Sequence, residues 1–175
     1  PTVPNPPRPV RLIALMNQKG GVGKTTTTVN LAASFARAGR PTLVIDLDPQ
    51  AHASLHLGVD PGSDRASIYD CLIDPAFDAS SALVEVNPNL WVLPSTTDLA
   101  AAETELAGMP ERERRLEKVL TALGGRFEFV LIDCPPSLGL LTINALAAAR
   151  EVLIPMQAHF LALQGVGKLL ETVGL

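Results

Sequence analysis

The feature of this sequence that most restricts its fold is a glycine-rich stretch at residues 17–28, NQKGGVGKTTTT. A short apolar run at 11–17, RLIALMN, precedes it and has the character of a buried parallel strand. From Lys24 to Ala38 the apolar residues follow helical spacing, and a glycine at 39 ends the pattern. A strand, a glycine-rich turn and a helix in this order are typical of a phosphate-binding loop.

The residue types in the loop suit the binding of an anion. Glycines can take positive φ angles, so the backbone N–H groups can curl around a phosphate, and the helix N-terminus adds partial positive charge. Lys24 can reach the β- and γ-phosphates, and the hydroxyl of Thr25 can ligate Mg²⁺. The alternative is a turn that binds nothing, but the full string between strand and helix argues against it. The predicted nucleotide-binding residues are Lys19, Gly20, Gly21, Val22, Gly23, Lys24, Thr25 and Thr26.

Two positions depart from the common pattern G-x-x-x-x-G-K-[ST]. Gln18 stands where the first glycine is expected, and the paired glycines at 20–21 supply flexibility two residues later. Lys19 places a second cation inside the loop, close to Lys24. One interpretation is a solvated lysine. The other is that two subunits meet face to face and Lys19 of one acts in trans on the phosphates of the other, as an arginine finger does.

The rest of the chain alternates short apolar runs with helical patterns. Further strands are predicted at 41–48, 90–95, 127–136 and 151–156, and helices at 67–72, 97–107, 111–123, 138–149 and 161–173. Ser67 is a better candidate than Asp64 to cap the first of these helices. This alternation predicts an α/β fold, a mostly parallel sheet flanked by helices in a Rossmann-like three-layer P-loop NTPase. We expect a Pro-rich leader at 1–10 and a single domain at 11–175 that lacks its C-terminal portion.

Three carboxylates follow predicted strands, at the edge where parallel sheets bind ligands. Asp46 and Asp48 are two apart, so both are expected on one face of the strand end. Asp133 ends the apolar run FVLID, which is the Walker B arrangement for holding Mg²⁺. Pro135 and Pro136 after it predict a switch II loop with few conformations. A single strand-end Asp is more often a solvated residue or a helix cap, but three in this order after a phosphate loop favour a site.

These motifs carry a family resemblance. KGGVGKTT, VIDLDPQA and FVLIDCPPSLG resemble the deviant Walker A, switch I and switch II motifs of the ParA/MinD ATPase superfamily. The wider string NQKGGVGKTTTTVNLAASFARAGRPTLVIDLDPQ is similar to the ParA (Soj-like) branch in particular. The similarity runs from about residue 11 to the last residue, and family members are typically longer than this chain.

The resemblance implies Mg²⁺-dependent hydrolysis of ATP by a protein that cycles between a monomer and an ATP-sandwich dimer. Asp48 would position or activate the attacking water, and Asp46 would support the Mg²⁺ and the loop around it. The catalytic residues implied are Lys19, Lys24 and Asp48, and the metal residues are Thr25, Asp133 and Asp46. The implied partners are a second copy of the chain, a ParB-like stimulating protein and DNA that is bound without sequence preference. The implied location is the cytoplasm, in association with the nucleoid. The implied function is to partition or position plasmid or chromosomal DNA.

Four other functions compete with this one. A MinD-like membrane-associated positioning ATPase would need a C-terminal amphipathic helix, and the motif sequences NQKGGVGKTTT and DLDPQ favour ParA. A metal-cluster scaffold or reductase would be expected to carry a C-x-x-C pair, whereas Cys71 and Cys134 are far apart. A tyrosine kinase of this loop type carries tyrosine clusters, and Tyr69 is the only tyrosine. The last alternative is a fragment that binds nucleotide without hydrolysing it.

Composition limits the remaining possibilities. The formal net charge of −4 gives no electrostatic footprint for nucleic acid within these 175 residues. No apolar run approaches the ~18 residues of a membrane span, and no signal peptide precedes the first strand. The two cysteines are expected to be buried thiols, and Trp91 is expected to be a core residue.

The histidines are not assigned a function. His52 and His56 are spaced for one helix face, but no third metal ligand is evident. Ala51–His52 stands where ParA proteins usually have Gly-Asn. His159 stands where the family often has an acidic residue.

Overall fold

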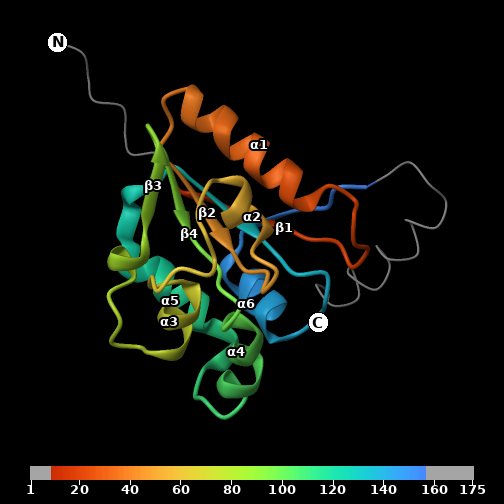
Figure 1. The fold of residues 1–175 in the computed structure, drawn as a ribbon, viewed down its shortest axis with the longest axis vertical. Helices are drawn as coiled ribbons and strands as arrows, with labels where there is room; N and C mark the ends of the chain where they lie inside the picture. Colours follow the sequence, from red (N-terminus) through yellow and green to blue (C-terminus); the bar gives the residue numbers. More distant parts are fainter. Residues whose placement is uncertain (1–8, 157–175) are drawn as a thin grey trace.

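The computed structural model describes residues 9–156, which form a sheet covered by helices on both faces (Figure 1). Within that range the six strands are ordered β3-β4-β2-β5-β1-β6, and only β3 runs antiparallel to its neighbour. The strands are β1 (Arg11–Leu15), β2 (Thr42–Asp46), β3 (Val84–Asn87), β4 (Leu90–Leu93), β5 (Phe129–Asp133) and β6 (Glu151–Leu153). The helices are α1 (Lys24–Arg37), α2 (His52–His56), α3 (Ile68–Ile73), α4 (Leu99–Leu106), α5 (Arg115–Leu123) and α6 (Leu140–Ala148), with three short 3₁₀ turns.

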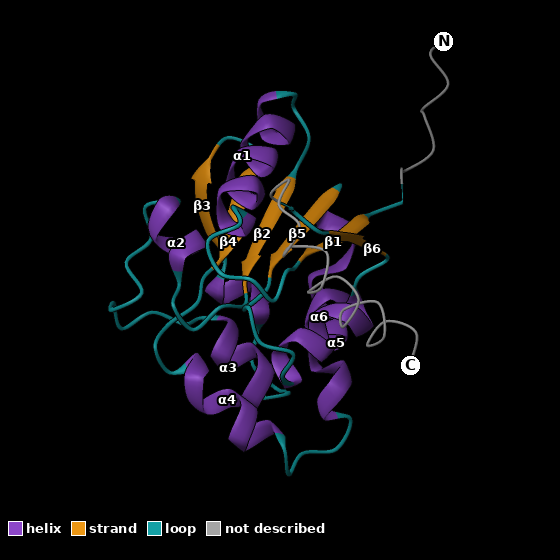
Figure 2. Cartoon of the chain, turned by 90° about the vertical axis from the view of Figure 1, so that its right-hand side faces the viewer, coloured by secondary structure: helices purple, strands orange, loops and turns teal. Residues whose placement is uncertain are grey.

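The pleat of the central strands divides the core into two layers. In β2, Leu43 and Ile45 belong to the larger cluster, which includes residues of α3, α4, α5 and α6. Val44 points the other way, into a smaller cluster with Ala32 and Ala36 of α1. Both faces of β2 are therefore buried, which explains its continuous apolar sequence. Figure 2 shows the sheet between α1 and the pair α5 and α6.

The strand register brings the predicted acidic residues to one edge of the sheet. β5 lies between β1 and β2, and Asp133 is the register partner of both Leu15 and Asp46. The glycine-rich loop leaves the sheet directly after β1, and further loops leave it after β2 and β5. Three loops therefore converge at the carboxyl edge, where ligands of parallel sheets bind.

The fold class predicted from the sequence is confirmed, with differences at the strand ends. Strand β2 ends at Asp46, so the expectation that Asp46 and Asp48 share one strand face is wrong; Asp48 lies in the following loop. The reason is local, since the carboxylate of Asp46 accepts a hydrogen bond from the Asp48 N–H and turns the backbone out of the sheet. Sequence patterns also missed β3 and α2, which are short and carry mixed polar and apolar residues.

Other predictions are confirmed in detail. Ser67 caps α3 by accepting a hydrogen bond from the Tyr69 N–H, and Asp70 completes a capping box. Cys71 and Cys134 are free and buried. Trp91 is partly buried and packs against the larger core. The helix predicted at 161–173 and most of the leader lie outside the described residues. None of the helices in residues 9–156 has both the length and the apolar character required to cross a bilayer.

Candidate nucleotide site

The glycine-rich loop between β1 and α1 has the backbone geometry that an anion cradle requires. Gly21 and Gly23 have φ angles of 71° and 88°, a region that residues with a Cβ rarely adopt. Asn17 fixes the start of the loop, because its side chain accepts a hydrogen bond from the Lys19 N–H and donates one to the Pro155 carbonyl. Each of these two bonds is 2.9 Å long, and Asn17 is buried. Its partner after β6 is far away in sequence, so no local sequence pattern could have predicted this role.

The start of α1 is bonded to the end of β5. The Thr25 hydroxyl donates to one oxygen of Asp133 at 2.7 Å, and the Thr28 hydroxyl lies 3.0 Å from the other oxygen. Lys24, which is only 8% exposed, lies in the same first turn. Thr28 was not predicted, although its spacing of three residues from Thr25 puts the two hydroxyls on one helix face. The structure therefore brings Lys24, Thr25 and Asp133 together, as the sequence predicts.

The Asp133 carboxylate sits in an environment suited to a cation. Burial raises its pKa above the ordinary value for an aspartate, while the hydroxyls of Thr25 and Thr28 and the positive charge of Lys24 oppose that rise. Its described hydrogen-bond partners are hydroxyls, which can turn to offer lone pairs to an ion. A divalent cation beside these oxygens would offset the burial of the charge. The arrangement has the hard oxygen donors that Mg²⁺ prefers.

Asp46 is bonded instead to the helix that follows it. One of its oxygens accepts hydrogen bonds from both the N–H and the hydroxyl of Ser54, each at 2.7 Å. Ser54 in turn accepts a hydrogen bond from the Ser95 N–H at 3.0 Å, just past the end of β4. Burial raises the pKa of Asp46 to about 6, although the hydrogen bonds from Ser54 and Asp48 oppose the rise. Ser54 and Ser95 were not predicted, because α2 itself was not.

Asp48 lies in the turn between β2 and α2. Its carboxylate accepts a hydrogen bond from the Gln50 N–H at 2.9 Å, and its carbonyl accepts one from the Ala51 N–H at 2.8 Å. Ala51 is buried and has a φ of 53°, which is uncommon for a residue with a side chain. The turn holds Asp48 away from the sheet and at the surface of a pocket.

That pocket has a volume of about 420 Å³ and two walls. The loop and the start of α1 make one wall, and the segments after β2 and β5 make the other. Its lining residues are Gly20, Gly21, Gly23, Lys24, Thr25 and Thr26 on the first wall and Asp48, Gln50, His52 and Pro136 on the second. Lys19 is exposed and is not part of the lining, Val22 is buried, and Pro135 is buried beside the lining residue Pro136. His52 was considered only as a metal ligand, so its place in this wall is a finding of the structure.

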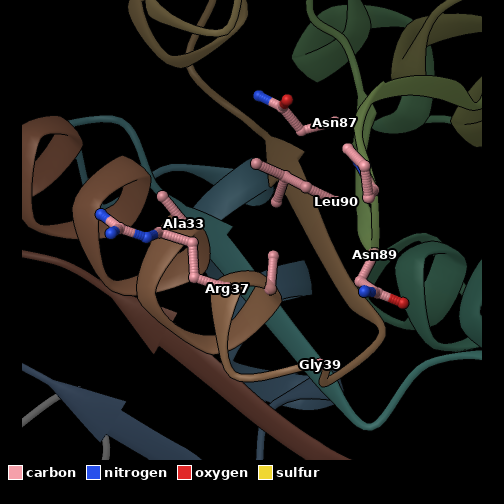
Figure 3. A pocket seen from close by; sticks show the side chains of 8 residues that line it. Ala33, Arg37, Gly39, Asn87, Asn89 and Leu90 are labelled. Carbon is pink, nitrogen blue, oxygen red and sulfur yellow. The ribbon is translucent and has the colours of Figure 1, made fainter.

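A second pocket, of about 430 Å³, lies at the opposite edge of the sheet (Figure 3). Ala33 and Arg37 of α1 line one side, and residues 87–90 around the turn from β3 to β4 line the other. None of the predicted site residues reaches it. It also lies at the amino edge of the parallel strands, away from the edge where such sheets bind ligands.

Comparison with known proteins identifies the family. The AAA domain family model (AAA_31) matches residues 10–175. The Sporulation initiation inhibitor protein Soj of Bacillus subtilis (strain 168) is 47% identical over 165 residues, which are 94% of this chain and 65% of the relative. The Chromosome partitioning protein ParA of Myxococcus xanthus (strain DK1622) is 48% identical, over 94% of this chain and 58% of its own length. The chain belongs to the ParA/Soj branch of the ParA/MinD superfamily.

A solved structure of similar fold agrees with the arrangement of this ParA-family chain. Cobyrinic acid a,c-diamide synthase from Mycobacterium smegmatis, crystallised with bound ADP and magnesium, has a TM-score of 0.90 and 43% identity. The similarity covers 95% of this chain and 67% of that one. The chain spans about three fifths of the length of the curated ParA and Soj relatives it matches.

Proposed function

We propose that this chain is the nucleotide-binding part of a ParA-type ATPase that alternates between a monomer and an ATP-bound dimer. The observation that carries the proposal is the hydrogen bond from Thr25, which lines the pocket together with Asp48, to the buried carboxylate of Asp133. The glycine loop would take the phosphate chain, with Lys24 reaching the terminal phosphates. Adenine nucleotide is the expected ligand because the similar mycobacterial structure was solved with bound ADP and with an ATP analog.

Thr25 and Asp133 would hold a Mg²⁺ ion together with the nucleotide. When bound, the ion would neutralise charge on the bridging phosphate oxygens and fix their positions. The residues fit this role because Asp133 is a buried carboxylate paired with two hydroxyls, one of which is the expected metal ligand. Asp46 would act through the loop, since its hydrogen bonds go to Ser54 and the Asp48 N–H.

Asp48 would orient the attacking water, and Lys19 would complete the site of a second copy. Asp48 lines the wall opposite the phosphate loop, where its free carboxylate oxygen can accept a proton or a hydrogen bond from water. Lys19 is exposed, and its backbone is held by Asn17 while its side chain is outside the pocket lining. A cation placed in this way can serve the phosphates of a facing subunit better than those of its own.

In the whole protein, the ATP dimer would bind DNA without sequence preference, and a ParB-like protein would stimulate hydrolysis and release it. The cycle would partition or position plasmid or chromosomal DNA at the nucleoid, in the cytoplasm. The printed names of the two sequence relatives, a chromosome partitioning protein and Soj, support this choice. A membrane-associated MinD-like role is the alternative to be tested.

The deciding experiment measures ATP turnover of the full-length protein alone, with DNA, with DNA and a ParB-like peptide, and with anionic lipid vesicles. Stimulation by DNA and the peptide, without stimulation by lipid, is expected. Stimulation by lipid alone would replace the proposal with the MinD-like function. The Asp48→Ala variant should form a long-lived ATP dimer with turnover reduced by about 10²-fold or more, and rapid hydrolysis by that variant would assign the water-activating acid elsewhere.

A further inference from the structure

His52 lines the nucleotide pocket from the wall that faces the phosphate loop. It is the first residue of α2, and it follows the positive φ of Ala51. The Ser54 N–H and hydroxyl bind Asp46 beneath the helix, so this end of α2 is fixed to the sheet. The imidazole is exposed at the pocket surface. His56, one turn later on the same helix, is also exposed but does not line the pocket.

The position of this wall determines which part of a nucleotide it meets. Phosphate loops hold the phosphates near the helix N-terminus, where Lys24 would reach the terminal ones and Thr25 would hold the metal ion that neutralises their charge. The facing wall, with Asp48 and His52, is therefore next to the end of the phosphate chain. A group on this wall can tell a triphosphate from a diphosphate, since the diphosphate lacks the phosphate that reaches it.

The charges around His52 determine what a terminal phosphate meets at this wall. Lys24 of α1 is the cation of the opposite wall, and Asp48 is the carboxylate on the same wall. Asp46 of β2 and Asp133 of β5 are buried and hydrogen-bonded to Ser54 and to Thr25 and Thr28. The negative charge of Asp48 opposes a terminal phosphate here, and an N–H donated by the His52 imidazole to that phosphate would offset part of the opposition.

We propose that the His52 imidazole donates a hydrogen bond to the terminal phosphate of ATP and so strengthens the preference for ATP over ADP. The inference rests on the proposed function, because it requires that the pocket holds ATP. It differs from that function in naming a contact that the phosphate-loop motif does not contain.

The test measures, by calorimetry with Mg²⁺, the affinity of the full-length protein for a non-hydrolysable ATP analog and for ADP. The quantity compared is the ratio of the two affinities, in the native protein and in His52→Ala. We expect the native ratio to exceed the variant ratio by about fivefold, because the variant lacks the donor to the terminal phosphate. His56→Ala is the matched control and should follow the native protein.

An unchanged ratio in His52→Ala would overturn the inference while leaving the proposed function intact. An equal loss of analog and ADP affinity is one form of that result, and it would mean that His52 serves the loop and not the terminal phosphate. His52→Phe, which keeps a ring without an N–H donor, serves if His52→Ala does not fold. Absence of nucleotide binding by the native protein would overturn the proposed function itself.

Discussion

At the scale of single residues, the turn after β2 contains a backbone conformation that is unusual for a residue with a side chain. Ala51 has a φ of 53° and is buried, and its N–H is bonded to the Asp48 carbonyl. For residues other than glycine this conformation costs roughly 1–2 kcal/mol. The turn therefore stores a small strain beside the residue proposed to orient water.

Replacement of Ala51 should reveal that strain. In Ala51→Gly the relief of strain exceeds the entropy that glycine loses on folding, so the free energy of unfolding should rise by about 0.5 kcal/mol. Ala51→Val should lower it by about 2 kcal/mol or more, because a β-branched residue fits this φ poorly. Urea unfolding of the two variants and the native protein gives the comparison. Equal stability of the Gly and Val variants would mean that the turn relaxes freely.

The buried Asp46 predicts a pH dependence of stability. Its pKa is raised from the ordinary 3.8 to about 6, so between these values the folded protein retains a proton that the unfolded chain loses. Its contribution to stability is therefore full below pH 4, falls as pH rises to about 6, and is constant above that. Because Asn does not titrate, the unfolding free energy of Asp46→Asn relative to the native protein should rise by roughly 2.4 kcal/mol from pH 4 to 7.

Unfolding in urea with EDTA, at intervals from pH 4 to 7, measures the difference in unfolding free energy between Asp46→Asn and the native protein without interference from metal. Asp64→Asn, which removes an exposed carboxylate, is the control for a general change of charge. A difference between Asp46→Asn and the native protein that does not vary with pH would show that Asp46 keeps its charge throughout.

Sequence reasoning succeeded for residues whose role follows from a local pattern and failed for those defined by a distant partner. The glycine loop, Lys24, Thr25 and Asp133 stand next to strand or helix ends that hydrophobic periodicity locates. Their convergence then follows from the parallel register. Asn17 and Ser54 act through Pro155 and Asp46, which no local pattern pairs with them.

At the scale of elements, α4 supplies the acceptor that α6 lacks at its start. The N-cap of α6 is Gly139, which has no side chain, and Glu103 of α4 accepts a hydrogen bond from the Leu141 N–H at 3.2 Å. A Cβ on residue 139 would lie 2.0 Å from a carboxylate oxygen of Glu103. The space for a side chain at residue 139 is therefore taken by the flexible end of Glu103, whereas the φ of −89° is open to any residue.

Gly139→Ala should therefore displace Glu103 and lower the free energy of unfolding by about 1–2 kcal/mol. Glu103→Ala should cost a similar amount, and the double variant should cost little more than either single one, because both changes remove the same hydrogen bond. Gly108→Ala, where an added Cβ meets nothing within 4 Å, is the control. Additive losses in the double variant would show that the two residues act separately.

The elements that the sequence missed share a physical cause. Strand β3 is an antiparallel edge strand with alternating burial over four residues, and α2 has five residues with two histidines. Both are too short for periodicity to separate them from a loop. Tertiary contacts define them instead: pairing with β4 in one case and the bonds from Ser54 to Asp46 in the other.

At the scale of the whole molecule, the role in trans proposed for Lys19 would make activity depend on assembly. Lys19→Ala should leave nucleotide affinity of the monomer within about twofold, because the side chain does not line its own pocket. It should abolish ATP-dependent dimerisation and lower turnover by about 10³-fold. Light scattering with a non-hydrolysable analog and steady-state turnover measure the two effects. Lys118→Ala, at another exposed lysine, is the control, and unchanged turnover in Lys19→Ala would refute the role in trans.

The chain of hydrogen bonds from Asp46 through Ser54 to Ser95 has a mechanical consequence. It bonds α2 to the ends of β2 and β4, so a movement of this helix against the sheet would require these hydrogen bonds to break. We therefore expect a change of the pocket's occupant to be accommodated by backbone rotation in residues 48–51, with α2 staying in place.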